Sequence, residues 1–415
     1  MKKNLILMII ICLAMSLFSN IVFASGNPEV FKLGVLLPFT GTFGAVAETQ
    51  KQGALQAVED CNAKGGLSMP WGKVKVEAIV ADDEAKIDVG LRRFNYMVGQ
   101  GINGLVGQTW SPLYVAINEV AKKNAIPYFP TCVAAYKTLK KGALAECTFC
   151  PANSSRTVGL ISANTAVNVL GAKSVYLLGR SDSWGDDIYD GFMEFIEGTD
   201  IEVLGYDRVP VGTRNFTAIL QKVKAAKPDV FLFAQFAGDC AAVLKQAGEL
   251  GLKEDNIKLL NAYITNAVAA GIPQDILEGV YANAYFYWDL TGFPDKKIVQ
   301  SVAAFSKHYE EAWGVPPDAY SVIAYDGVTA LLHAVENAGS FDPAEISKTI
   351  LFRPTFETAK GKAYWRKDHQ PVSQYTAFVL RGKAPADKKG EWDFFNVIGS
   401  AGGEEVLPSL KNMGY

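Results

Sequence analysis

The 415-residue sequence contains only three histidines, and they lie far apart along the chain. A zinc site or a nucleophile–base pair needs such residues in a recognisable set or at short spacings. The sequence also lacks a phosphate-binding loop, an HExxH motif and a GxSxG motif. We therefore expect no enzyme activity, no bound metal and no cofactor. The histidines are His308, His333 and His369.

The chain has no excess of basic residues. Lys and Arg number 40 against 43 Asp and Glu, which gives a net charge of -3. A nucleic-acid-binding surface or a polybasic membrane patch would need clustered positive charge. With 49% hydrophobic and 20% charged residues, the composition is that of a folded globular protein. We expect no nucleic-acid partner and, at this length, two lobes instead of one core.

A long apolar run occurs once, near the start of the chain. Leu5–Phe18 follows two lysines and precedes a small-residue site at Val22-Phe23-Ala24. This is the layout of a secretory signal peptide. The alternative, a membrane anchor, is disfavoured because the run is shorter than the roughly 20 residues that span a bilayer. We predict that residues 1–24 are a signal peptide cleaved near Ala24, and that the mature protein is periplasmic.

Glycine, cysteine and acidic motifs are present, but their context does not favour chemistry. Gly99-Gln-Gly101-Ile-Asn-Gly104 fits GxGxxG, yet it leads from a helical pattern into a strand, the reverse of a dinucleotide site. Cys147-Thr-Phe-Cys150 lacks the second cysteine pair of a zinc site. We interpret Asp82-Asp83-Glu84 as a helix-capping run, because acidic residues favour helix N-termini. A disulfide among Cys132, Cys147 and Cys150 stays open, and Cys61 and Cys240 are expected to be buried.

Short β-rich runs alternate with longer helical periods along the chain. The expected strands are 31–39, 74–81, 104–108, 127–130, 174–179, 229–235, 258–261, 280–285, 375–380 and 392–397. The expected helices are 49–64, 87–99, 112–123, 158–170, 186–197, 216–226, 240–250, 298–313 and 320–338. Most of the strands are apolar on both faces, which is typical of parallel sheets covered by helices. Ser111 and Pro112 are expected to cap and open one helix.

The alternation pauses at residues 148–155 and again at 285–294. We interpret these pauses as crossings between two doubly wound α/β lobes.

Aromatic residues recur where the predicted strands end. Ligands of open α/β sheets bind beyond the carboxyl ends of the strands. A single aromatic residue there is commonly core packing, but several at separate strand ends predict an apolar-walled cleft. These residues are Phe43, Trp110, Tyr136, Trp184, Phe236 and Tyr263.

Several segments are similar to one known family. They are Gly34-Val-Leu-Leu-Pro38-Phe-Thr-Gly41, Gly53–Val58, Asn62–Gly66, Asp82-Asp83, Gly107, Ser111, Trp184-Gly185, Phe216, Lys227-Pro-Asp229, Tyr325-Asp-Gly327 and Lys360–Tyr364. With these segments the chain resembles the periplasmic branched-chain amino acid and amide-binding family, which has the type I periplasmic binding fold. The resemblance covers essentially the whole mature chain. It implies two lobes joined by a three-strand hinge, and a ligand trapped by hinge closure. The first lobe would comprise residues 27–151 and 286–365, and the second would comprise residues 152–285 and 366–415.

The resemblance also implies roles for individual residues. The family has a serine at the position of Ser111, at a helix start, that receives the ligand carboxylate; free N–H groups at such a start favour an anion. In the family, a threonine helps to hold the head group of the ligand, and its position aligns with Ala134. The acidic residue that balances the α-ammonium group of the ligand aligns with Tyr263. Trp184 and Phe236 match aromatic positions. Because an unpaired ammonium in a closed cleft is costly, we expect an aromatic or other apolar carboxylate.

Other functions stay open at this point. They are binding of a branched-chain amino acid or amide, binding of an organic cation in an aromatic cage, and a periplasmic sensor lobe that signals to a receptor. By resemblance, the partners are a small-molecule ligand and the membrane permease of an ABC uptake transporter. We expect a monomer.

Overall fold

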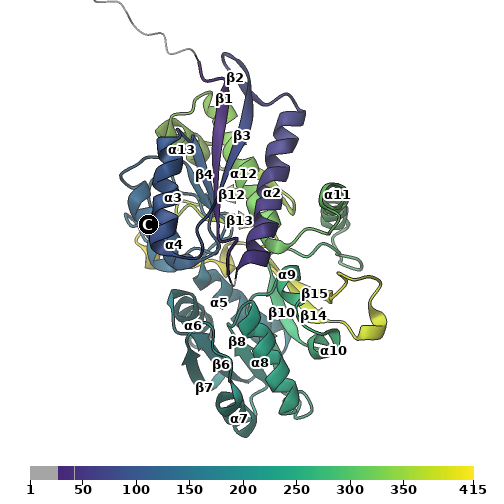
Figure 1. The fold of residues 1–415 in the computed structure, drawn as a ribbon. Coiled ribbons are helices and arrows are strands. Elements are labelled where there is room, and N and C mark those ends of the chain that lie inside the picture. The colour runs from purple at the N-terminus through teal and green to yellow at the C-terminus, as the bar shows by residue number, and fades with distance from the viewer. Residues whose placement is uncertain (1–26, 42) are drawn as a thin grey trace, which may run out of the picture.

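The computed structural model describes residues 27–41 and 43–415, so the predicted signal peptide lies outside the described residues. Two large sheets, each flanked by helices, form the upper and lower parts of the molecule in Figure 1. The strands are β1 (Val30–Leu37), β2 (Leu67–Met69), β3 (Gly72–Asp82), β4 (Gly104–Gly107), β5 (Tyr128–Pro130), β6 (Ser174–Arg180), β7 (Glu202–Val209), β8 (Val230–Phe233), β9 (Lys258–Asn261), β10 (Tyr281–Ala284), β11 (Thr355–Thr358), β12 (Gly361–Trp365), β13 (Pro371–Ser373), β14 (Ala377–Gly382) and β15 (Phe395–Ala401).

The helices are α2 (Gly44–Ala63), α3 (Ile87–Gly99), α4 (Ser111–Ala121), α5 (Ser155–Asn164), α6 (Ser183–Ile196), α7 (Thr217–Ala226), α8 (Gly238–Glu249), α9 (Asn266–Ala269), α10 (Gln274–Leu277), α11 (Lys296–Trp313), α12 (Ala319–Ala338) and α13 (Pro343–Phe352). No helix within the described residues is both long and apolar enough to cross a bilayer.

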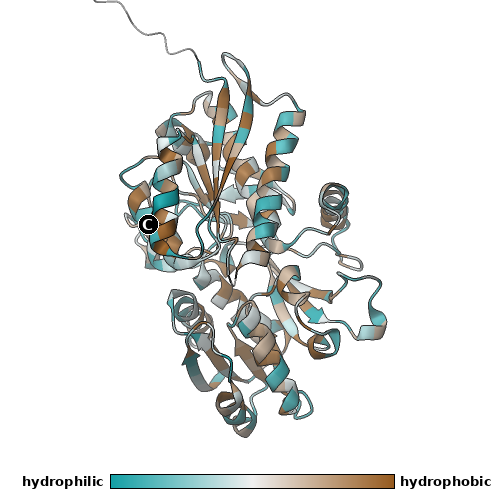
Figure 2. Ribbon diagram, in the orientation of Figure 1, coloured by the Kyte–Doolittle hydropathy of each residue, from teal (hydrophilic) through white to brown (hydrophobic). Residues whose placement is uncertain are grey.

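The first sheet has the strand order β2-β3-β1-β4-β5, and β1 lies parallel to both of its neighbours. Because side chains alternate along a strand, β1 supplies both faces of the sheet. Phe31, Leu33 and Val35 join the apolar cluster under α2 and α12, whereas Leu36 joins the cluster under α3 and α4. The strands of this sheet are predominantly brown in Figure 2, and the outer faces of the helices are teal. This pattern is the buried, helix-covered sheet that the apolar runs predict.

Helices α2 and α12 approach each other closely at Gly53. A Cβ atom at this position would lie 1.9 Å from the carbonyl oxygen of Ser321. Only glycine fits such a contact between two backbones. The two helices therefore pack as a unit on one face of the first sheet (Figure 1).

The second sheet has the order β15-β14-β10-β9-β8-β6-β7. Strands β6 to β10 are parallel to their neighbours among themselves, and β14 and β15 add two antiparallel strands at one edge. We call the body around the first sheet the first lobe and the body around this sheet the second lobe. The chain crosses between them after β5, after β10 and before β14.

The small third sheet, β11-β12-β13, belongs by packing to the first lobe. Trp365 lies against Phe129 and Phe149, with ring centroids 5.9 and 5.3 Å apart. The C-terminal residues also return there, because Met413 lies in the same apolar cluster as Leu36. The predicted lobe boundaries remain a prediction, and from this packing we propose that residues 366–373 and 407–415 belong to the first lobe.

The expected elements agree with the structure in most places. The ten expected strands match β1, β3, β4, β5, β6, β8, β9, β10, β14 and β15, with shifts of a few residues at their ends. The nine expected helices match α2 to α8, α11 and α12, although α5 ends at Asn164 and a π-helical turn follows. Strands β2, β7 and β11 to β13 and helices α9, α10 and α13 were not expected.

Two capping predictions are wrong. The N-cap of α4 is Trp110, without a side-chain cap bond, and the hydroxyl of Ser111 donates to the carbonyl oxygen of Val133 at 3.3 Å. The N-cap of α3 is Lys86, also without a side-chain cap bond. Asp82 instead accepts a hydrogen bond from the Phe39 N–H at 3.0 Å, which ties the end of β3 to the end of β1. Proline at the first turn of α4 is confirmed.

Candidate ligand-binding site

The loops that follow the strands of the two lobes meet at their interface. Val46 and Val133 of the first lobe lie in the same apolar cluster as Trp184 and Tyr263 of the second. The start of α12 joins this cluster through Tyr320. The carboxyl ends of parallel strands are where ligands of α/β sheets bind, so this interface is the candidate site.

Four aromatic rings, the cleft aromatics, converge at this interface: Trp184, Phe236, Tyr263 and Tyr320. The Tyr263 ring is central, with centroid distances of 6.3 Å to Trp184, 6.4 Å to Phe236 and 5.8 Å to Tyr320. Tyr320 also lies 6.1 Å from Phe236. Three rings follow β6, β8 and β9 of the second lobe, and the fourth comes from the first lobe. Mutually tilted and edge-to-face rings of this kind form a rigid apolar wall.

Several polar atoms beside these rings are buried and lack a hydrogen-bond partner. They include Oε1 of Gln235, Oδ1 of Asn261 and the hydroxyl of Tyr263. The amide orientations are fixed, because Gln235 Nε2 donates to the Gly179 carbonyl at 3.1 Å and Asn261 Nδ2 donates to the Gln235 carbonyl at 3.0 Å. Buried polar atoms normally have partners, so this group is a place where a polar ligand or water would bond.

The first lobe contributes a matching set of polar groups. Gln50 Nε2 donates to the Thr131 hydroxyl at 2.9 Å, and Gln50 Oε1 accepts from the Thr109 hydroxyl. Gln108 Nε2 and Asp83 Oδ2 are buried without a partner. Burial raises the pKa of Asp83 to about 6. Its Oδ1 accepts from the Ala85 N–H at 2.8 Å, so Oδ2 alone is open to a ligand or water.

Arg180, the last residue of β6, is the buried cation of the site. It is only 7% exposed. Its guanidinium pairs with Asp182 and lies 5.9 Å from the Trp184 ring. Its charge also acts on Tyr320, whose pKa is nevertheless raised because the phenol is buried. Arg180 thus places a positive charge beside the cleft aromatics.

Ser111 and Trp110 lie together where α4 begins. Ser111 is 8% exposed, and Trp110 is half-buried against the cluster of α3 and α4. The first N–H groups of a helix have no partner within that helix. The start of α4 therefore offers backbone donors, although the Ser111 hydroxyl is bonded to Val133.

The other predicted site residues lie away from the cleft aromatics or are already bonded. The Ala134 N–H donates to Asn153 and its carbonyl accepts from Ser155, so Ala134 is part of the first crossing segment. The Tyr136 N–H donates to Asp187 of α6 at 2.9 Å. Phe43 is the N-cap of α2 and half-buried. Among the described ring pairs, none joins Phe43, Trp110 or Tyr136 to the cleft aromatics.

Sequence reasoning missed Tyr320, Arg180 and Asp318, the N-cap of α12 that bonds the Ala267 N–H of the second lobe. Arg180 directly follows a predicted strand, so its position at a strand end was a usable signal. Tyr320 and Asp318 lie at the start of α12, and no strand precedes them. Only the fold brings this distant segment to the strand ends.

The thiols and the potential metal ligands do not form a reactive cluster in the described part of the chain. Cys61, Cys132, Cys147, Cys150 and Cys240 are all free thiols. Burial raises the pKa of Cys132 and of Cys150, which keeps both thiols protonated and unreactive. Within residues 27–41 and 43–415, no group of three His, Cys, Asp or Glu side chains could hold a metal ion.

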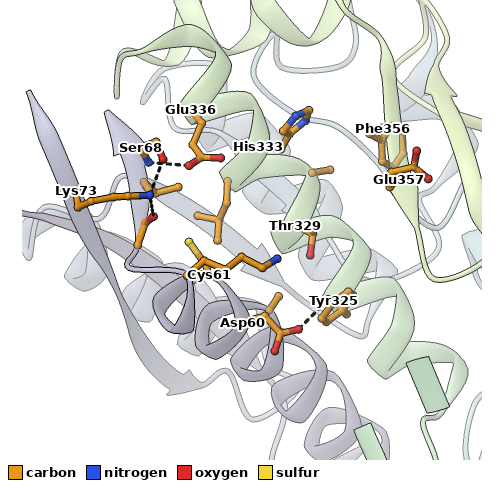
Figure 3. A pocket seen from close by; sticks show the side chains of 16 residues that line it. Asp60, Cys61, Ser68, Lys73, Tyr325, Thr329, His333, Glu336, Phe356 and Glu357 are labelled. Carbon is orange, nitrogen blue, oxygen red and sulfur yellow. Dashed lines mark hydrogen bonds between the residues drawn. The ribbon is translucent and has the colours of Figure 1, made fainter. Parts of the chain in front are cut away.

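A separate pocket of about 350 Å³ lies between α2 and α12 of the first lobe (Figure 3). Two of its three acidic side chains, Asp60 and Glu336, already accept hydrogen bonds from the lining. The Tyr325 hydroxyl donates to Asp60 at 2.9 Å, and the Ser68 N–H donates to Glu336 at 2.7 Å. The interface between the lobes, with its unpartnered polar atoms, therefore remains the candidate site.

Comparisons with known proteins agree with this fold. A Leu/Ile/Val-binding protein of Rhizobium johnstonii is 25% identical over 365 residues, which cover 87% of this chain and 94% of the relative. An amino acid ABC transporter substrate-binding protein of Pseudomonas fluorescens has a TM-score of 0.82 at 22% identity, covering 94% of this chain and 99% of the other.

A solute-binding protein of an R. palustris ABC transporter, solved in complex with benzoate, has a TM-score of 0.74 at 18% identity. It covers 90% of this chain and 97% of the other. The sequence pattern of one family, described as periplasmic binding protein, matches residues 30–387. The chain therefore belongs to the periplasmic binding protein family.

Proposed function

We propose that this solute-binding protein captures a small carboxylate with an apolar, aromatic body and delivers it to the permease of an ABC uptake transporter. The two lobes close on the ligand as a hinged pair. The ring of the ligand packs against the cleft aromatics, and its carboxylate binds Arg180 and the start of α4 at Ser111. The protein binds its ligand without changing it.

The observation that carries this proposal is the buried cation beside a wall of rings. A guanidinium binds a carboxylate through parallel N–H donors, and Asp182 occupies only part of that donor set in Arg180. Ring-on-ring contacts each add about 0.5–1.5 kcal/mol beyond the burial of apolar area. The benzoate complex of the R. palustris protein supports the same chemistry on the same fold.

A second candidate ligand is a branched-chain amino acid. Asp83 favours it, because its buried Oδ2 has no partner and would accept a hydrogen bond from an α-ammonium group. The name of the Rhizobium johnstonii relative supports it as well. The charge of the ammonium group would then be balanced by Asp83 of the first lobe, and not by a residue at the position of Tyr263.

A thermal-shift titration with matched compounds separates the candidates. Benzoate and benzamide differ only in the group that carries the charge, and leucine adds an ammonium. A ligand that binds only the folded protein stabilises it by about 2.7 kcal/mol at a concentration 100 times its Kd. We expect benzoate to raise the Tm by several degrees and benzamide to have little effect.

Each alternative outcome has a clear meaning. A rise in Tm with leucine but not with benzoate would show that the ligand is an amino acid and not an aromatic acid. A rise in Tm with choline alone would favour an organic cation bound in an aromatic cage. If no compound of a wider panel of acids, amides and amines raised the Tm, a sensor lobe that binds another protein would be the better interpretation.

A further inference from the structure

The side chain of Lys360 is buried where two of the crossing segments meet. Lys360 lies in the turn between β11 and β12 and is 4% exposed. Its Nζ donates to the carbonyl oxygen of Tyr285 at 2.7 Å and to that of Thr376 at 3.1 Å. Tyr285 directly follows β10 and Thr376 directly precedes β14. One ammonium group therefore bonds the second and the third crossing segments at once.

The ammonium group also lies over a ring, and a carboxylate bonds the segments around it. Nζ of Lys360 lies 3.4 Å from the centroid of the Tyr285 ring. Asp326 of α12 accepts from the Ala359 N–H at 2.9 Å and from the Tyr285 hydroxyl at 3.3 Å. Side chains of the first lobe thus contact the carbonyl, the ring and the hydroxyl of Tyr285.

A gain in stability does not by itself explain why the charge of Lys360 is buried. Burial lowers the pKa of Lys360 and raises that of Asp326, and the attraction between the two charges opposes both shifts. Replacement of a buried ion pair by apolar residues is often neutral or stabilising. Two carbonyl acceptors and a ring face favour the ammonium form. What Lys360 supplies is a shared attachment point, because its ammonium bonds two separate backbone segments at once.

We propose that Lys360 is the hinge-positioning residue of this protein. Hinge closure concentrates backbone rotation in a few residues, and a bond shared by two crossing segments makes them rotate about a common point. Without this bond the lobes adopt a wider range of arrangements, and closure on a ligand is less favourable. The inference rests on the proposed capture by hinge closure.

Hydrogen exchange measured by mass spectrometry on the ligand-free full chain tests the proposal. The variants are Lys360→Met, which removes both bonds, Lys360→Gln, which keeps one amide donor, and Lys360→Arg, which keeps the charge. Lys362→Met is the matched control, because Lys362 lies on the same hairpin and its side chain is 75% exposed.

We expect Lys360→Met to speed exchange tenfold or more in peptides that cover residues 285–290 and 374–377. Peptides from β1 and β6 should exchange as in the wild type. Lys360→Gln should have a smaller effect on the crossing segments, Lys360→Arg should restore most of the protection, and Lys362→Met should change nothing.

Unchanged exchange in the crossing segments of Lys360→Met would overturn the proposal. Faster exchange throughout both lobes, including β1 and β6, would assign Lys360 a purely structural role and overturn it as well. If Lys360→Met does not fold, Lys360→Gln decides by the same criterion. Because these measurements need no ligand, they are independent of whether benzoate binds, and a failure of the proposed function would appear separately in the benzoate titration.

Discussion

The carboxylate of Asp318 accepts a hydrogen bond from the backbone N–H of Ala267 at 3.0 Å. Asp318 is the N-cap of α12 in the first lobe, and Ala267 lies in the first turn of α9 in the second. The amide of Asn266 adds a bond to the Pro317 carbonyl at 3.3 Å. The starts of two helices thus meet across the interface between the lobes, beside Tyr320.

Replacement of Asp318 by alanine should weaken ligand binding more than it weakens the fold. The variant loses an N-cap, worth about 0.5–2 kcal/mol, and also the bond to Ala267, which joins the two lobes. We expect a Kd for benzoate at least fivefold higher, measured by calorimetry. Asp342→Ala is the control, since Asp342 caps α13 within one lobe. Equal losses of affinity in both variants would contradict the prediction.

Replacement of Trp184 by phenylalanine should remove the fluorescence signal of ligand binding. The variant keeps a ring beside Tyr263 but loses the indole N–H bond to the Ala234 carbonyl, a loss of about 1 kcal/mol. We expect benzoate to bind with a Kd within threefold of the wild type while the change in tryptophan emission disappears. Trp71→Phe, altered at a first-lobe tryptophan that bonds the Pro28 carbonyl, should keep the full change. A full change in Trp184→Phe would place the ligand elsewhere.

Replacement of Arg180 by methionine should reduce affinity for the acid selectively. Without the guanidinium, the carboxylate of benzoate loses its charged partner and remains beside apolar rings. We expect at least a tenfold higher Kd for benzoate and little change for benzamide, both measured by calorimetry. Arg208→Met is the control, because Arg208 is a more exposed arginine of the same lobe that pairs with Asp186. If benzoate bound Arg180→Met as well as it binds the wild type, Arg180 would not hold the carboxylate.

The buried carboxyl of Asp83 should make the ligand-free protein less stable as the pH rises from about 4 to about 6. Its pKa is raised by burial to about 6, above the value of about 3.9 in an unfolded chain. Across that range the native state holds more protons than the unfolded state, so the free energy of unfolding falls as the pH rises. Asp83→Asn cannot lose a proton and should lack this decline.

Urea unfolding at pH 4.5 and pH 7 measures the effect. The wild type should lose on the order of 2 kcal/mol relative to Asp83→Asn between these conditions. Asp82→Asn should change little between these conditions, because burial is outweighed by hydrogen bonds from Thr40, Glu84 and Phe39 that lower the pKa of Asp82, so this carboxyl is already ionised at pH 4.5. Parallel pH profiles for the wild type and Asp83→Asn would contradict the prediction.

Much of the fold could be predicted because its central strands are buried on both faces. β8, for example, is the run Val230–Phe233, which is entirely buried and entirely apolar. β7 was missed because it is a half-exposed edge strand, and it carries Glu202, Asp207 and Arg208. β11 to β13 are short strands in hairpins, where polar residues alternate with apolar ones and the apolar run is too short to recognise.

The candidate site could be predicted only where neighbouring strands end. Trp184, Phe236 and Tyr263 follow β6, β8 and β9, which are adjacent in the sheet, so the rule for strand ends brought them together. The rule gave no information on Tyr320, whose helix reaches the site from far along the chain. It also could not foresee that the Ser111 hydroxyl bonds the carbonyl of Val133, because that contact depends on the path of a loop.

The packing of Met413 beside Leu36 has a practical consequence for biosensors. The described chain begins at β1 and ends on the same body, so labels attached at residue 27 and at the C-terminus would travel together if the lobes closed as proposed. A reporter pair fused at these two ends would stay nearly silent when ligand binds. A responsive sensor needs one fluorophore inserted in the other body, for instance in the turn between α8 and β9, which is remote from the rings.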